Sequence, residues 1–256
     1  MERITSSKNP TIRALRALNQ RKGREEQGRF LVEGEVMIRE ALGCGLTVRD
    51  AVATERCSAL AEALAGRGAR VCLVPEPVLA AVCDTRTPQG VCASFDLLRP
   101  APLDAAPDWL VALDGVQDPG NVGTIWRTAD AAGLQGLLLG SGCADPLSPK
   151  VQRAAMGSSF RLPFSQTEDL AEALRTLRER GWTVIASDLR GEDFYARPAP
   201  GRRYVLVIGS EARGISDGVR AQADARVRLP MRGGAESLNA AVAAGILMYA
   251  LTRELG

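Results

Sequence analysis

The sequence contains no histidine. This absence excludes Ser-His-Asp and Cys-His catalysis and every metal site that requires an imidazole ligand. The six cysteines include no C-x-x-C pair, and most lie in apolar stretches, so we expect small core residues in a reducing compartment. The sequence also lacks an apolar N-terminal leader and any apolar run of membrane-spanning length, which predicts a cytoplasmic protein.

Net charge is small, only +2, and by itself says nothing about nucleic acid. The distribution of charge is more informative, because residues 1–30 hold eight Lys or Arg and only three Glu. A basic surface of this kind is compatible with phosphate contacts. The alternative is a solvated helix face, and charge alone does not decide between the two.

A proline-rich stretch, residues 99–107, predicts a linker between a domain at 1–98 and a domain at 108–256. In the first domain we expect helices at 9–20, 35–42, 58–65 and 76–82, and strands at 30–32, 48–53, 70–74 and 91–95. This alternation predicts a small α/β sandwich.

The second domain alternates more clearly. We expect strands at 109–113, 136–140, 182–186, 204–208 and 225–229, and helices at 121–132, 149–156, 170–180 and 237–253. Continuous apolar strands between helices indicate a mainly parallel sheet covered on both faces. Ligands of such sheets bind beyond the carboxyl ends of the strands.

Three segments share one plan, in which a strand or strand end leads through a glycine-rich turn with polar side chains into a helix. They are residues 118–130 (DPGNVGTIWRTAD), 205–215 (VLVIGSEARGI) and 229–239 (LPMRGGAESLN). Glycine lets backbone groups approach a ligand closely, so three such segments predict a pocket built from several loop ends. Neither G-x-G-x-x-G nor a P-loop is present, which disfavours those nucleotide-binding classes.

Five polar side chains in these segments are candidate site residues. Asn121 is expected to be a helix cap or loop residue, while Arg127 either reaches along the helix toward the pocket or forms a surface salt bridge. Glu211 either accepts hydrogen bonds from backbone N–H groups or Arg127, or staples the loop. Ser237 is a possible helix cap, and the Asn239 amide, in the first turn of an apolar helix, requires a partner in a loop or ligand. The residues alone indicate a ligand-binding domain and no particular reaction.

In this order the three segments resemble the motifs of the SpoU/TrmH branch of the SPOUT superfamily, which methylates ribose 2′-hydroxyls of RNA. Residues 121–129 match N-x-G-x-x-x-R-T-A, residues 209–214 match G-x-E-x-x-G, and residues 230–239 match P-M-x-G-x-x-E-S-L-N. The family usually has Asn where this chain has Ser210. The first domain, with TSSKN at 5–9, resembles the ribosomal-protein-like RNA-binding domain that often precedes it, as do its other motifs, FLVEG at 30–34 and TPQG at 87–90.

The resemblance implies a C-terminal trefoil knot, bound S-adenosylmethionine and an obligate homodimer. It assigns cofactor contacts to Gly209, Leu229 and Leu238, activation of the ribose hydroxyl to Arg127, and supporting roles to Asn121, Glu211, Ser237 and Asn239. Arginine stays protonated, so stabilising the developing alkoxide or a bridging phosphate is a more defensible role than that of a base. Residues 240–251 are apolar nearly all round, so we expect part of this helix, with the helix that carries Arg127, to form a two-fold interface.

The expected function is therefore an S-adenosylmethionine-dependent RNA 2′-O-methyltransferase. The N-terminal domain favours 23S ribosomal RNA over tRNA as the substrate. The alternative is a non-catalytic RNA-binding or ribosome-assembly factor that has kept the fold, and four retained polar residues argue against it: Arg127, Glu211, Ser237 and Asn239.

Overall fold

The computed structural model describes residues 1–103, 107–197 and 201–255. The chain divides into two compact units, one of Met1–Leu98 with Leu147–Arg153 and one of Arg99–Pro146 with Ala154–Gly256. Part of the expected linker, residues 104–106, lies outside the described residues. Within those ranges, no helix is long and apolar enough to cross a membrane.

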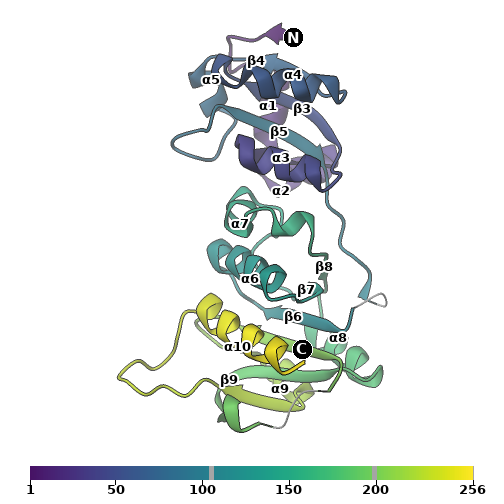
Figure 1. Cartoon of the computed structure of the whole chain (residues 1–256), viewed down its shortest axis with the longest axis vertical. Coiled ribbons are helices and arrows are strands. Elements are labelled where there is room, and N and C mark those ends of the chain that lie inside the picture. The colour runs from purple at the N-terminus through teal and green to yellow at the C-terminus, as the bar shows by residue number, and fades with distance from the viewer. Residues whose placement is uncertain (104–106, 198–200, 256) are drawn as a thin grey trace. The chain divides into compact units, whose positions relative to one another are not determined.

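The first unit is built on a mixed five-stranded sheet (Figure 1) with the strand order β1-β4-β3-β5-β2. Its strands are β1 (Glu2–Arg3), β2 (Arg29–Glu33), β3 (Val48–Ala53), β4 (Arg70–Leu73) and β5 (Val91–Asp96). Its helices are α1 (Pro10–Ala17), α2 (Arg21–Gln27), α3 (Glu35–Gly43), α4 (Ser58–Gly66) and α5 (Glu76–Ala80). The apolar strands alternate with helices as the sequence predicts, and β5 runs antiparallel to both of its neighbours.

The helix expected at 9–20 is α1, which ends at Ala17, and the helix that follows it, α2, was not predicted from the sequence. Asn9 caps α1 by accepting a hydrogen bond from the Thr11 amide (2.8 Å). The chain then turns after α1 into α2, and the two helices pack closely because Gly23 has no side chain. A Cβ atom there would lie 2.1 Å from the Ala17 carbonyl oxygen. Buried Arg24 of α2 donates to the Leu18 carbonyl (2.9 Å) and satisfies the end of α1.

The second unit contains a six-stranded sheet in which every pair is parallel, with the order β11-β9-β10-β6-β7-β8. Its strands are β6 (Trp109–Asp114), β7 (Gly136–Leu139), β8 (Phe164–Gln166), β9 (Thr183–Asp193), β10 (Tyr204–Gly209) and β11 (Ala225–Arg228). Its helices are α6 (Pro119–Ala131), α8 (Leu170–Glu179), α9 (Asp217–Gln222) and α10 (Ala240–Leu255). A further helix, α7 (Pro149–Ala155), belongs to the first unit as far as Arg153. The predicted parallel sheet is confirmed.

The order of strands reverses beside β6, because β7 and β8 continue to one side and β9, β10 and β11 lie on the other. Helices α8 and α9 pack on the sheet through a cluster of buried residues that includes Leu174, Leu177 and Val219. Helix α10 packs against α6 (Figure 1). Open parallel sheets bind ligands at such reversals, beyond the carboxyl ends of their strands.

Strand β9 is longer than the predicted strand 182–186 and contains a bulge. Its register to β11 shifts between Arg226 and Val227, so that Ala186 pairs with Arg226 but Glu192 pairs with Val227. Residues 187–191 therefore loop out from the ladder. The return of the loop requires Gly191, since a Cβ atom there would lie 2.6 Å from the Arg226 carbonyl oxygen.

Candidate active site

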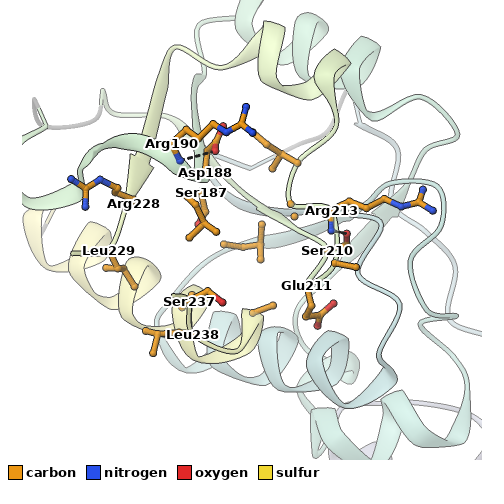
Figure 2. Close-up of a pocket in the computed structure, with 18 of the residues that line it drawn as sticks. Ser187, Asp188, Arg190, Ser210, Glu211, Arg213, Arg228, Leu229, Ser237 and Leu238 are labelled. Carbon is orange, nitrogen blue, oxygen red and sulfur yellow. Dashed lines mark hydrogen bonds between the residues drawn. The ribbon is translucent and has the colours of Figure 1, made fainter. Parts of the chain in front are cut away.

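A cavity of about 500 Å³ lies at the carboxyl end of β10, beside the bulge of β9 and the segment between β11 and α10 (Figure 2). Its size falls in the ordinary range for small-molecule sites. The second and third glycine-rich segments line it, as the sequence predicts. The first segment, which begins α6, contributes no residue to the lining.

The loop after β10 forms one wall as a tight turn. Ser210 and Gly214 exchange two backbone hydrogen bonds of 3.1 and 2.8 Å, and Gly214 adopts a positive φ of 66°. The Ser210 hydroxyl accepts a further hydrogen bond from the Arg213 amide (3.2 Å), so serine can close this turn in place of the family's asparagine. Gly209 has no space for a side chain, because a Cβ would lie 2.2 Å from the Gly214 carbonyl carbon.

The bulge in β9 forms a second wall, which the sequence analysis missed. The Asp188 carboxylate accepts hydrogen bonds from the Arg190 amide and from the Arg220 guanidinium, both 3.0 Å long, and Figure 2 shows the first of them. Only 8% of the Asp188 side chain is exposed. Burial acts to raise the pKa of Asp188, but the two hydrogen bonds and the positive charge of Arg220 outweigh it, and the pKa is lowered. Leu189 lines the cavity and is otherwise 67% exposed.

The segment before α10 forms the third wall. Leu229, Ser237 and Leu238 line the cavity, and all three are labelled in Figure 2. Together with Gly209, the two leucines complete the set to which the family resemblance assigns cofactor contacts. All three residues of that set line one cavity.

The expectation that Ser237 caps the last helix is wrong. Asn239 takes this role, because its side-chain oxygen accepts hydrogen bonds from the amides of Ala241 (2.9 Å) and Val242 (3.3 Å). Asparagine and serine are equally good caps, so the residue type does not decide between them. Helix α10 begins at Ala240, and Asn239 directly precedes it. Asn239 is also exposed, contrary to the expectation of a buried amide.

A chain of side-chain hydrogen bonds joins all three segments. The Asn239 amide donates to the Asn121 side-chain oxygen (3.0 Å), and the Asn121 amide donates to the Glu211 carboxylate. Asn121 is not a cap, since Asp118 fills that position and accepts from the Asn121 backbone amide (2.8 Å). Pro119 explains the earlier start of α6, because proline suits the first helical position.

Arg127 lies apart from this chain of hydrogen bonds. Its side chain is exposed, and it forms no hydrogen bond or ion pair within the described ranges. The expected surface salt bridge and the expected bond to Glu211 are both wrong. Arg127 is also absent from the cavity lining, so its guanidinium is available to a molecule outside the described chain.

Family models match both parts of the chain. The model of the SpoU rRNA methylase family matches residues 108–249, which is more than half of the sequence. The chain belongs to this family. The model of the MRM3-like substrate binding domain matches residues 9–93.

Similar proteins span the full length of this SpoU family member. A 23S rRNA (guanosine(2553)-2′-O)-methyltransferase of Bacillus subtilis is 33% identical, over 98% of this chain and 99% of its own. An rRNA methyltransferase of Sinorhizobium meliloti, solved with AdoMet bound, has a TM-score of 0.89 and 36% identity, covering 100% of this chain and 98% of its own. The SpoU methyltransferase AviRb of Streptomyces viridochromogenes, in complex with AdoMet, has a TM-score of 0.84 and 31% identity, with 97% and 98% covered.

These likenesses confirm the family, the fold, the cofactor and the class of reaction that the motifs imply. The second unit has the trefoil-knotted SPOUT fold, and the chain is an S-adenosylmethionine-dependent RNA methyltransferase. The knot runs against the general rule that chains do not thread their own loops, and the periodicity of the sequence contains no sign of it.

The cavity fits S-adenosylmethionine on the chemistry of its own walls. Leu189, Leu229 and Leu238 would offer apolar contacts to the adenine of the cofactor, and the turn between Gly209 and Gly214 lines the same cavity. Its lining also includes charged side chains, among them Asp188 and Glu211, so the polar parts of the cofactor would find partners as well.

Proposed function

We propose that this protein transfers the methyl group of S-adenosylmethionine to a ribose 2′-hydroxyl of 23S ribosomal RNA. The observation that carries the proposal is the meeting of the second and third family motifs around one cavity, joined to the first motif through Asn121. The full-length likeness to a 23S rRNA 2′-O-methyltransferase supports ribosomal RNA over tRNA. Ribosomal RNA as the substrate is in turn the reason to expect the protein in the cytoplasm.

The cofactor, when bound, supplies an electrophilic methyl group on a sulfonium sulfur. The chain's own contribution is positioning. Gly209, Leu229 and Leu238 line the cavity that would hold it, and the hydrogen bonds from Asn239 through Asn121 to Glu211 fix the loops on either side. Holding two reactants in line accounts for a large part of the acceleration in such transfers.

Arg127 is the proposed catalytic residue. Its side chain is solvent-exposed on α6, the helix that also holds Asn121. A guanidinium remains protonated at neutral pH, so its role is to stabilise negative charge on the attacking ribose oxygen or to hold a neighbouring phosphate. Within the described residues no carboxylate forms an ion pair with Arg127, so its positive charge is available to the substrate.

The working form in this proposal is a homodimer. Helix α10 exposes Val242, Ile246 and Tyr249, with 52%, 39% and 53% of each residue accessible. Their spacing of four and three residues places them in one stripe along the helix. An exposed apolar stripe on a helix that packs against α6 suits a two-fold contact in which the same surface of each copy meets the other.

The direct test uses 23S rRNA transcribed in vitro, purified protein and isotopically labelled S-adenosylmethionine. We expect label in the RNA, and after nuclease digestion mass spectrometry should place the methyl group on a ribose. A tRNA pool serves as the competing substrate. Methyl groups on a base would refute ribose chemistry, and preferential labelling of tRNA would refute the choice of ribosomal RNA.

A further inference from the structure

We infer that a second cavity, in the first unit, binds a phosphate-bearing nucleotide segment of the RNA substrate through Arg13, Arg16 and Asn19. The cavity measures about 560 Å³ and is formed between the end of α1 and residues 81–84. This inference rests on the proposed function, because it assigns RNA as the ligand, and it locates the contact on particular side chains.

The ion pairs of the first unit single out these arginines. Among the eight cations of residues 1–30, four form ion pairs: Arg3 with Glu55, Arg21 with Glu25, Lys22 with Glu26, and Arg29 with Asp50. A fifth, Arg24, is buried and donates to the Leu18 carbonyl. Lys8, Arg13 and Arg16 remain, with no side-chain hydrogen bond or ion pair in the part of the chain that the structure describes.

Two of these three free cations line the same cavity. Arg13 and Arg16 are exposed and lie three residues apart, so both point to one face of α1, while Ile12 and Leu15 of the same helix are buried in the core. Two adjacent, uncommitted guanidinium groups match the geometry of successive phosphates, since each presents a planar set of donors.

Asn19, which also lines the cavity, adds a hydrogen-bond acceptor. The Asn19 side-chain amide donates to the carbonyls of Arg16 (3.1 Å) and Val82 (2.7 Å). Its oxygen is buried and has no donor among the described residues. Buried acceptors are nearly always paired, and the exocyclic amine or 2′-hydroxyl of a nucleotide would supply the missing donor.

One acidic residue also lines the cavity, and its charge is already compensated. The Asp84 carboxylate forms an ion pair of 3.0 Å with Arg153, a residue that belongs to the same compact unit. The net charge of the cavity lining is therefore positive. RNA suits this lining better than an acidic or apolar protein segment of similar size, because its sugars also carry hydrogen-bond donors and acceptors for Asn19 and Gln20.

The experiment compares two double variants of the full-length protein. Arg13→Gln with Arg16→Gln removes the two cavity cations. Arg21→Gln with Lys22→Gln removes the same charge from α2 of the same unit, where both side chains are already ion-paired. Binding of a 23S rRNA transcript is measured by filter retention from 50 to 300 mM KCl, and cofactor affinity is measured by calorimetry.

We expect the cavity variant to bind the transcript about 10- to 30-fold more weakly near 0.15 M salt, and its log–log salt slope to fall by about 1.5, as for the loss of two phosphate contacts. The α2 variant should stay within about threefold of the wild type. Both should bind S-adenosylmethionine normally, and the cavity variant should show a raised KM for RNA with an unchanged kcat.

Equal weakening in both variants would overturn the inference, because net charge alone would then explain binding. An unchanged salt slope in the cavity variant would overturn it as well. The proposed function fails separately: a wild-type protein that binds the transcript through Arg13 and Arg16 but does not methylate its ribose would contradict the reaction and leave the binding site standing.

Discussion

Asn121→Ala is the sharpest test of how the active site is held together. Asn121 joins α6 to the loop after β10 by donating to Glu211, and joins α6 to α10 by accepting from Asn239. Alanine removes both side-chain hydrogen bonds. It leaves intact the bond from the backbone amide of residue 121 to Asp118, which belongs to the helix start.

The expected magnitude follows from these two bonds. A neutral hydrogen bond contributes about 0.5 to 1.5 kcal/mol to stability, and one to a charged group about 1.5 to 3 kcal/mol. Glu211 and Asn239 are exposed, so water replaces part of each bond, and we expect about 1 to 2 kcal/mol in all. If the same free energy orders the loops for the cofactor, affinity falls by about 5- to 30-fold, since 1.4 kcal/mol corresponds to a factor of ten.

Calorimetric titration with S-adenosylhomocysteine measures this loss. Thr124→Ala is the matched control, because Thr124 lies on the same helix, is exposed, and its hydroxyl forms no hydrogen bond within the described residues. The control should bind like the wild type. Affinity of Asn121→Ala within twofold of the wild type would refute the reasoning, since the loops would then be ordered without the side-chain bonds.

Three further predictions concern catalysis, pH and assembly. Arg127→Ala should lower the single-turnover methyl transfer rate by about 10² to 10³ without changing cofactor affinity, and Arg127→Lys should restore little; wild-type rates would remove Arg127 from the active site. Asp188 has a lowered pKa when folded, so its ionised form stabilises the protein above the unfolded pKa of about 3.9 and this contribution disappears as pH falls further. The stability gap between wild type and Asp188→Asn in denaturant melts should therefore be constant from pH 8 to 5 and shrink below about pH 4, whereas a gap that does not change with pH would contradict the assignment. Ile246→Glu should give a monomer in light scattering, while Val36→Glu, at a still more exposed apolar residue of the first unit, should not.

The class of each domain could be predicted because its main signals are local. The strand Tyr204–Gly209 is a continuous apolar run, buried as far as Ile208, and such runs indicate a parallel sheet. The order of strands has no local signal. The position of β10 between β6 and β9 depends on the path that the chain takes across the sheet, and so does the knot. The family resemblance supplied the knot, and the order of strands was not predicted.

The site was predictable where glycine marked it. Gly209 and the segment around Leu229 and Leu238 were found because glycine-rich turns after strands are recognisable, whereas the bulge with Asp188 and Leu189 has no such signature. Attention to the polar pair Ser187 and Asp188 directly after a predicted strand would have found it, since ligands lie at strand carboxyl ends. The partner of Glu211 was mistaken because spacing along one helix cannot show what another loop places beside it.

The chain of bonds through Asn121 also sets when this enzyme can become active during synthesis. Asn121 bonds to Glu211 across 90 residues and to Asn239 across 118, so both closures wait for distant parts of the chain. Proteins emerge from the ribosome N-terminal end first, and the first unit, except for residues 147–153, is complete by residue 98. A nascent chain can therefore form the cationic cavity of the first unit well before its cofactor site is complete. A product that ends between residues 153 and 239 would contain the whole first unit but not Asn239. By the proposals above it would bind RNA without modifying it, and would compete with the finished enzyme for the same substrate.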